Sequence, residues 1–181
     1  MRFFWNSLLI SKCYGDRQRS FPLETRAKGN PGVLVRHMAK STVPSYDIVE
    51  HTADLGVRFR GRDMSELFTN GALVLTDLLV PAAIRAESAR AVTVTVDGED
   101  SVDLLVRWLG EILYLFEGES LVTVDATIET LTPFHLDAAV WTLAFHPARH
   151  EPLYGIKAVT YHQADIAEKD NALEAFILLD V

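Results

Sequence analysis

Three short segments carry polar side chains of types that suit a binding or catalytic site. They are Glu50-His51-Thr52-Ala53-Asp54, then His150-Glu151 with Lys157 and His162 downstream, and finally Asp180-Val181 at the end of the chain. The last segment is the most unusual, because chain ends are commonly frayed and polar. Here an apolar, strand-like pattern continues almost to the last residue.

The end of the chain carries two adjacent anionic groups, the Asp180 side chain and the terminal carboxylate of Val181. Such groups repel each other unless a cation or a basic partner neutralises them. If Asp54 joins them from a neighbouring strand, three oxygen donors result, a set that suits Ca²⁺, Mg²⁺ or Mn²⁺ rather than zinc. The alternatives are a solvated strand end for Asp180 and an Asx turn or local cap for Asp54. The proximity of Asp54 and Asp180 is a hypothesis at this point.

The other polar residues carry weaker signals. His51 lies three residues before Asp54, His162 is equally compatible with a packed, hydrogen-bonded role, and Glu151 is compatible with plain solvation. No Ser/His/Asp order, glycine-rich phosphate loop or H-E-x-x-H pattern occurs. The single cysteine, Cys13, excludes an intramolecular disulfide and a cysteine-based zinc site. The sequence therefore offers no self-contained catalytic machinery.

The elements that must position these residues are readable from residue 46 onward. Apolar residues alternate over 55–60, and Asp63-x-x-Glu66 then predicts the start of a helix that ends before Pro81. A second helix is predicted to begin at Asp100 or Ser101 and to end near Gly118. Further strands are predicted over 92–96, 122–128, 136–143, 158–162 and 175–181, with turn residues at 169–171. This order predicts a single α+β domain, with a mainly antiparallel sheet and two helices packed on one face.

Charge divides the chain into two parts. Residues 1–45 hold eight Lys/Arg and two Asp/Glu, a net charge of +6. Residues 46–181 hold nine Lys/Arg and 23 Asp/Glu, a net charge of −14. A domain this acidic repels the phosphate backbone, which argues against autonomous nucleic-acid binding. It favours basic protein surfaces or cations as partners. We therefore expect any contact with RNA to be indirect.

Residues 1–45 show no sustained period of 2 or 3.6, and we interpret them as a disordered or misassigned extension upstream of a domain at 46–181. Translation is expected to start at Met38, with a weak organellar presequence as the alternative. The apolar run at 7–10 is too short for a secretory signal, and Lys12 interrupts it. No window approaches the ~20 apolar residues of a membrane span. These features, with one cysteine, predict a cytoplasmic protein.

Three motifs resemble those of the archease family. They are the segments 46–57 (YDIVEHTADLGV) and 155–162 (GIKAVTYH), and the ending Leu179-Asp180-Val181. The resemblance covers roughly residues 46–181, and the first 45 residues have no counterpart in it. One departure is Pro152-Leu153-Tyr154-Gly155, where the family tends to be more polar.

The resemblance implies a function that the residue pattern alone does not. Archeases are small α+β accessory proteins of the RtcB-type RNA ligase, which joins 2′,3′-cyclic-phosphate or 3′-phosphate ends to 5′-hydroxyl ends with GTP. They promote guanylylation of the ligase and multiple turnover in tRNA splicing or RNA repair. The family binds a divalent ion, calcium, at positions that match Asp54, Asp180 and Val181. Glu151 is the nearest match to a functional acid, and His51, Lys157 and His162 lie in or beside the motifs.

We therefore expect an activator of an RNA ligase rather than an enzyme. Two alternatives stay open. A chaperone-like modulator of RNA-modifying enzymes would expose a broad apolar patch and need no metal. A free-standing metal-dependent phosphohydrolase would need an open coordination position with a base nearby. The sequence leaves open the metal in the cell, the RNA substrate and the oligomeric state.

Overall fold

The computed structural model describes residues 43–50, 54–80, 89–146 and 152–181. Their elements are β1 (Tyr46–Glu50), β2 (Asp54–Gly61), α2 (Met64–Leu79), β3 (Arg90–Asp97), α3 (Ser101–Glu117), β4 (Leu121–Thr132), β5 (His135–Ala144), β6 (Ala158–Lys169) and β7 (Ala172–Asp180). The expectations for residues 1–42, including the start at Met38, lie outside the described residues. No helix within the described ranges is long and apolar enough to cross a membrane.

Both helices begin at the caps that the sequence predicts. The Asp63 side chain accepts a hydrogen bond of 2.8 Å from the backbone N–H of Glu66 at the start of α2. At the start of α3, Asp100 accepts hydrogen bonds of 2.8 Å from the N–H groups of Val102 and Asp103. Each carboxylate thus satisfies N–H donors that have no partner within the helix. Gly118 occupies the C-cap position of α3, as predicted.

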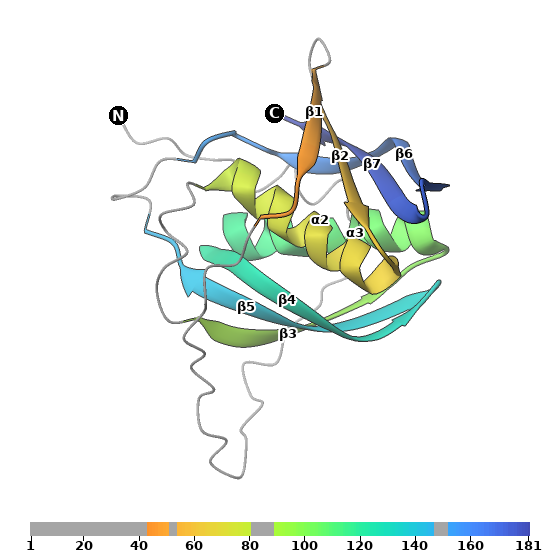
Figure 1. The fold of residues 1–181 in the computed structure, drawn as a ribbon. Helices are drawn as coiled ribbons and strands as arrows, with labels where there is room; N and C mark the ends of the chain where they lie inside the picture. The colour runs from red at the N-terminus through yellow and green to blue at the C-terminus, as the bar shows by residue number, and fades with distance from the viewer. Residues whose placement is uncertain (1–42, 51–53, 81–88, 147–151) are drawn as a thin grey trace. The chain divides into compact units, whose positions relative to one another are not determined.

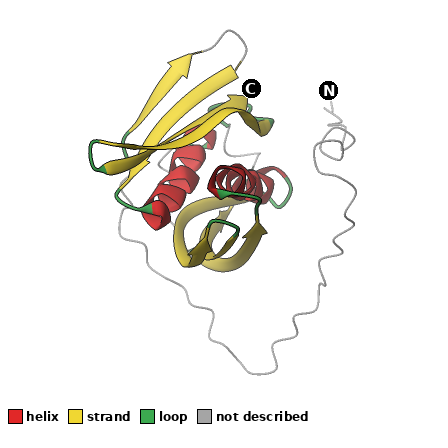
Figure 2. Ribbon diagram, turned by 90° about the vertical axis from the view of Figure 1, so that its right-hand side faces the viewer, coloured by secondary structure: helices red, strands yellow, loops and turns green. Residues whose placement is uncertain are grey.

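The strands form two antiparallel sheets with the helices between them (Figure 1). One sheet has the order β1-β2-β7-β6 and the other β3-β5-β4. Both α2 and α3 contact strands of both sheets, and Figure 2 shows the helices enclosed from the two sides. The predicted class, an α+β domain with antiparallel strands and two helices, is confirmed. The prediction placed the helices on one face of one sheet, and the structure adds the second sheet on their other side.

The interior between the sheets is closely packed. Trp108 of α3 is fully buried, and its Nε1–H donates to the backbone oxygen of Phe68 in α2 at 2.9 Å. Gly71 lets α2 approach β2, because a Cβ at this position would lie 3.0 Å from the Phe59 ring. This packed layer of helices supports the four-stranded sheet from within.

Two edge strands of the four-stranded sheet differ from the sequence-based expectation. The strand β1 was not predicted, because it is a short edge strand without sustained apolar alternation; Ile48, for example, is 42% exposed. The strand β6 extends to Lys169, well beyond the predicted 158–162, since its second half is polar and faces solvent. The predicted turn into β7 is confirmed: Asp170 and Asn171 both have positive φ, 53° and 61°, as a two-residue type I′ hairpin turn requires.

Candidate functional site

The fold places Asp54 and Asp180 directly opposite each other. Asp54 begins β2, Asp180 ends β7, and the two are Cα partners in the antiparallel register. Directly opposite residues project to the same face of a sheet, with Cβ atoms about 4.5–5.5 Å apart. That face points away from the helices, since the alternate residues Leu55 and Leu179 are buried in the core. The proximity hypothesised from the sequence is thus present in the fold.

The last residue is held beside this pair. The backbone N–H of Lys157 donates to the Asp180 carbonyl oxygen at 2.8 Å, and its Nζ donates to a terminal oxygen of Val181, also at 2.8 Å. Ala158, the first residue of β6, is the Cα partner of Asp180 on the side away from Asp54. Lys157, a candidate from the sequence, therefore anchors the end of the chain through both its backbone and its ammonium group.

Two acids lie opposite each other at this place. Asp54 and Asp180 are register partners, and the Lys157 ammonium group is bound to the Val181 oxygen. Like charges directly opposite in a sheet are destabilising. A bound cation would offset the repulsion between the two carboxylates.

The donor chemistry also fits such a cation. The carboxylates of the two aspartates and the Val181 oxygen are hard oxygen ligands, the type that Ca²⁺ and Mg²⁺ prefer. Within the described part of the chain, no three side chains of His, Cys, Asp or Glu are grouped so that they could hold a metal ion. A site here would therefore need a further donor besides Asp54 and Asp180, such as an oxygen of Val181.

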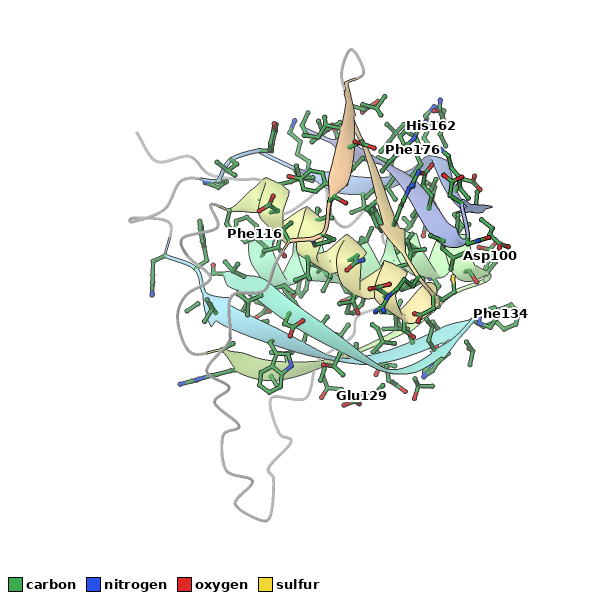
Figure 3. All side chains as sticks on the ribbon, in the orientation of Figure 1. Asp100, Phe116, Glu129, Phe134, His162 and Phe176 are labelled. Carbon is green, nitrogen blue, oxygen red and sulfur yellow. The ribbon has the colours of Figure 1, made fainter. Side chains whose placement is uncertain are left out.

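The remaining candidate residues are not part of the Asp54–Asp180 pairing. His51 and Glu151 lie outside the described residues. His162 is exposed on β6, in the segment 161–164 where the pairing with β7 is interrupted by a bulge. Its Nε2 lies 3.3 Å from the Gln163 side-chain amide, and Figure 3 shows it on the side of the four-stranded sheet. It is not a register partner of Asp180, whose neighbours are Asp54 and Ala158.

A hollow on the same outer face was not predicted from the sequence. It has a volume of about 370 Å³ and is lined by residues of all four strands: Val49, Arg58, Gln163, Asp165, Ala167, Lys169, Glu174 and Phe176. The Arg58 guanidinium lies 5.3 Å from the centroid of the Phe176 ring. Gly56 makes room for that ring, because a Cβ there would lie 3.1 Å from two ring atoms. Among them, Arg58 and Phe176 come together because β2 pairs with β7.

One end of the hollow is closed by ion pairs. Arg60 lies 2.7 Å from the Glu174 carboxylate, and Lys169 lies 3.3 Å from its other oxygen. The hydrogen bond from Arg60 is the main reason why the pKa of Glu174 is lowered. The same bond raises the pKa of Arg60. These three charges are thus satisfied within the protein.

Comparisons with known proteins identify the family and support the fold. Residues 46–181 match the model of the Archease protein family. Protein archease of Sulfurisphaera tokodaii is 30% identical over 140 residues, which cover 75% of this chain and 98% of the relative. Protein archease of Pyrococcus furiosus is 36% identical over 120 residues, covering 65% and 84%. The solution structure of Methanobacterium thermoautotrophicum protein 1598 matches with a TM-score of 0.62 and 27% identity, over 75% of this chain and 98% of that one. On the family match over residues 46–181 and the identity to these relatives, the chain belongs to the archease family.

Proposed function

We propose that this protein is a metal-binding accessory factor that activates an RtcB-type RNA ligase by promoting its guanylylation and multiple turnover. The observation that carries the proposal is the register of β2 and β7, which sets Asp54 opposite Asp180 beside the anchored chain terminus. The resemblance assigns the metal to the same three residues. The net charge of −14 over residues 46–181 supports a role through a protein partner rather than direct RNA binding.

In this proposal Asp54, Asp180 and the terminal carboxylate of Val181 hold the divalent ion. When bound, such an ion supplies positive charge that can neutralise developing charge on a phosphate. The protein's own residues keep the donors in place: Lys157 holds the terminus, and the buried Leu55 and Leu179 fix the two strands in register. The acidic domain approaches a basic, RNA-handling enzyme with favourable electrostatics.

The test substitutes Asp54→Ala and Asp180→Ala separately, and measures Ca²⁺ binding by calorimetry and ligase guanylylation with labelled GTP. Each variant should lose at least about tenfold in Ca²⁺ affinity, because affinity follows the number of charged ligands. Each should also leave the ligase without multiple turnover. Glu129→Ala is the matched control, since Glu129 is an exposed acid on β4 of the other sheet.

A chain extended by two residues beyond Val181 tests the terminal carboxylate separately, because both aspartates remain and only the terminal charge moves. It should also bind Ca²⁺ more weakly. Full turnover with Asp54→Ala, or activation that is indifferent to chelator, would contradict the proposal and favour the chaperone-like alternative. Phosphate release by the chain without any ligase would favour the phosphohydrolase.

A further inference from the structure

The outward-facing residues of the four-stranded sheet form rows across its strands, and the candidate metal site occupies only one of these rows. Successive outward rows across β2 and β7 are Asp54–Asp180, Gly56–Leu178 and Arg58–Phe176. The third row continues to Asp165 on β6, the register partner of Phe176. The carboxylate pair and the hollow around Phe176 are therefore on the same side of the sheet, although Leu178 in the row between them is only 2% exposed.

The distance between them is short compared with a protein interface. Asp180 and Phe176 are four residues apart on one strand, or about 14 Å. A standard interface buries roughly 800 Å² per partner, the area of a disc of about 16 Å radius. A protein partner centred on the hollow would therefore also reach the carboxylate pair.

Arg58 and Asp165 form no ion pair or hydrogen bond within the described residues, although Asp47 on β1 is the register partner of Arg58. The Arg58 guanidinium stacks near the Phe176 ring but forms no hydrogen bond or ion pair there, and neither does the Asp165 carboxylate. Arg60, one row further on, differs: it lies 2.7 Å from Glu174 and 3.8 Å from Asp170. The ion pairs on this face therefore stop where the hollow begins.

We propose that this outer face, with Arg58 and Phe176 at its centre, is the surface on which the ligase docks, an inference that rests on the proposed function. The ligase presents a carboxylate to Arg58 and a basic side chain to Asp165. The chemistry fits because arginine and aromatic residues dominate the binding energy of protein interfaces. The Phe176 ring also holds the guanidinium in place, so that less side-chain freedom is lost on binding.

Single-stranded RNA is the other class of ligand that stacks on an arginine and an aromatic ring. The net charge of −14 over residues 46–181 opposes it, and Lys169, a cation lining the hollow, is already paired with Glu174. The observations thus favour a protein partner, and RNA binding becomes an outcome of the test.

The experiment measures binding of the full chain to the ligase by calorimetry, in the presence of Ca²⁺. Arg58→Glu is compared with Arg90→Glu, which makes the same charge change at an exposed arginine on β3 of the other sheet. Asp165→Lys is compared with Glu129→Lys in the same way; Figure 3 shows Phe176 and Glu129 on opposite sheets. The first member of each pair should weaken binding at least tenfold, the size expected of a central interface residue. The second should change it less than twofold, and thermal unfolding and Ca²⁺ binding should be unaltered in all four.

The outcomes separate this inference from the proposed function. If the wild-type chain does not bind the ligase, the proposed function fails and the inference fails with it. If it binds, but each pair of variants behaves alike, the outer face is not the docking surface and the proposed function stands. Binding of an RNA oligonucleotide by the chain alone, weakened by Arg58→Glu, would also overturn the inference. Because Arg58 and Asp165 lie on different strands, misfolding of one variant leaves the other pair decisive.

Discussion

Two groups of charged residues, one on the outward face of each sheet, differ in how they are paired. On the three-stranded sheet, Nδ1 of His135 lies 2.7 Å from Asp97, and its Nε2 lies 3.1 Å from Asp137. Asp137 also accepts a 2.8 Å hydrogen bond from Thr95. On the four-stranded sheet, Asp54 faces Asp180, a like charge, and Arg58 forms no ion pair in the described part of the chain. The charges around His135 thus stabilise each other, whereas Asp54, Asp180 and Arg58 on the other sheet are suited to an external cation or protein, even though Arg60, Glu174 and Lys169 on the same face form ion pairs.

The two helices support both sheets, so the largest expected loss of stability comes from removing the buried side chain of Trp108 in α3. Trp108→Ala should lower the free energy of unfolding by about 3–5 kcal/mol, because a fully buried aromatic side chain is lost and a cavity remains. Urea unfolding measures this change, and hydrogen exchange should show reduced protection in both sheets. Protection lost in one sheet alone would show that the two faces are supported independently. Trp108→Phe, which keeps most of the volume, should have a smaller effect.

An intermediate effect is expected at the glycine beneath Phe176. Gly56→Ala should lower the free energy of unfolding by about 1–3 kcal/mol, because the new methyl group would lie 2.8 Å from the Val49 carbonyl oxygen and 3.1 Å from the Phe176 ring. The matched control is Gly155→Ala, since a Cβ at Gly155 meets no atom within 4 Å. Equal unfolding free energies for the two variants would mean that the ring is free to move, and that the hollow is not a fixed feature of the outer face.

The smallest expected effect is a pH dependence of the free energy of unfolding that comes from His135 on the three-stranded sheet. Hydrogen bonds from His135 to Asp97 and then to Asp137 raise the pKa of His135 above its ordinary value of 6.5. A raised pKa in the folded state contributes stability that is complete below pH 6.5 and is lost as pH rises through the folded value. The advantage of the wild-type protein over His135→Gln should therefore shrink as the pH rises.

The low-pH side of this prediction depends on Asp137. Its pKa is lowered below 3.8, first by the hydrogen bond from Thr95 and then by His135. That contribution is present above pH 3.8 and is lost as pH falls through the folded value. Thermal unfolding at several pH values, with an NMR titration of His135, measures both limits. A constant difference between wild type and His135→Gln across this range would contradict the assignment, and the effect stays small because the groups face solvent.

Local signals in the sequence were sufficient for most of the elements. The capping aspartates Asp63 and Asp100 fixed the starts of both helices, because an N-cap acts on the next two or three residues only. The strands whose apolar residues alternate were found for a similar reason, since one buried face gives a period of two. The edge strand β1 and the polar half of β6 were missed because exposed edges do not need that pattern.

The candidate site likewise combines features that the sequence determined with features that only the tertiary structure decided. The sequence by itself determined the residue types at Asp54, Asp180 and Val181, their oxygen donors and the acidic balance around them. Only the tertiary structure decided that Asp54 and Asp180 are opposite each other, that Lys157 holds the terminus, and that Arg58 shares a row with Phe176 and Asp165. The physical reason is that a hydrophobic pattern specifies that a strand has a buried face but not which strand lies next to it. The neighbours β2 and β7 are separated by most of the domain's length in sequence, and their pairing is set by how the whole core packs.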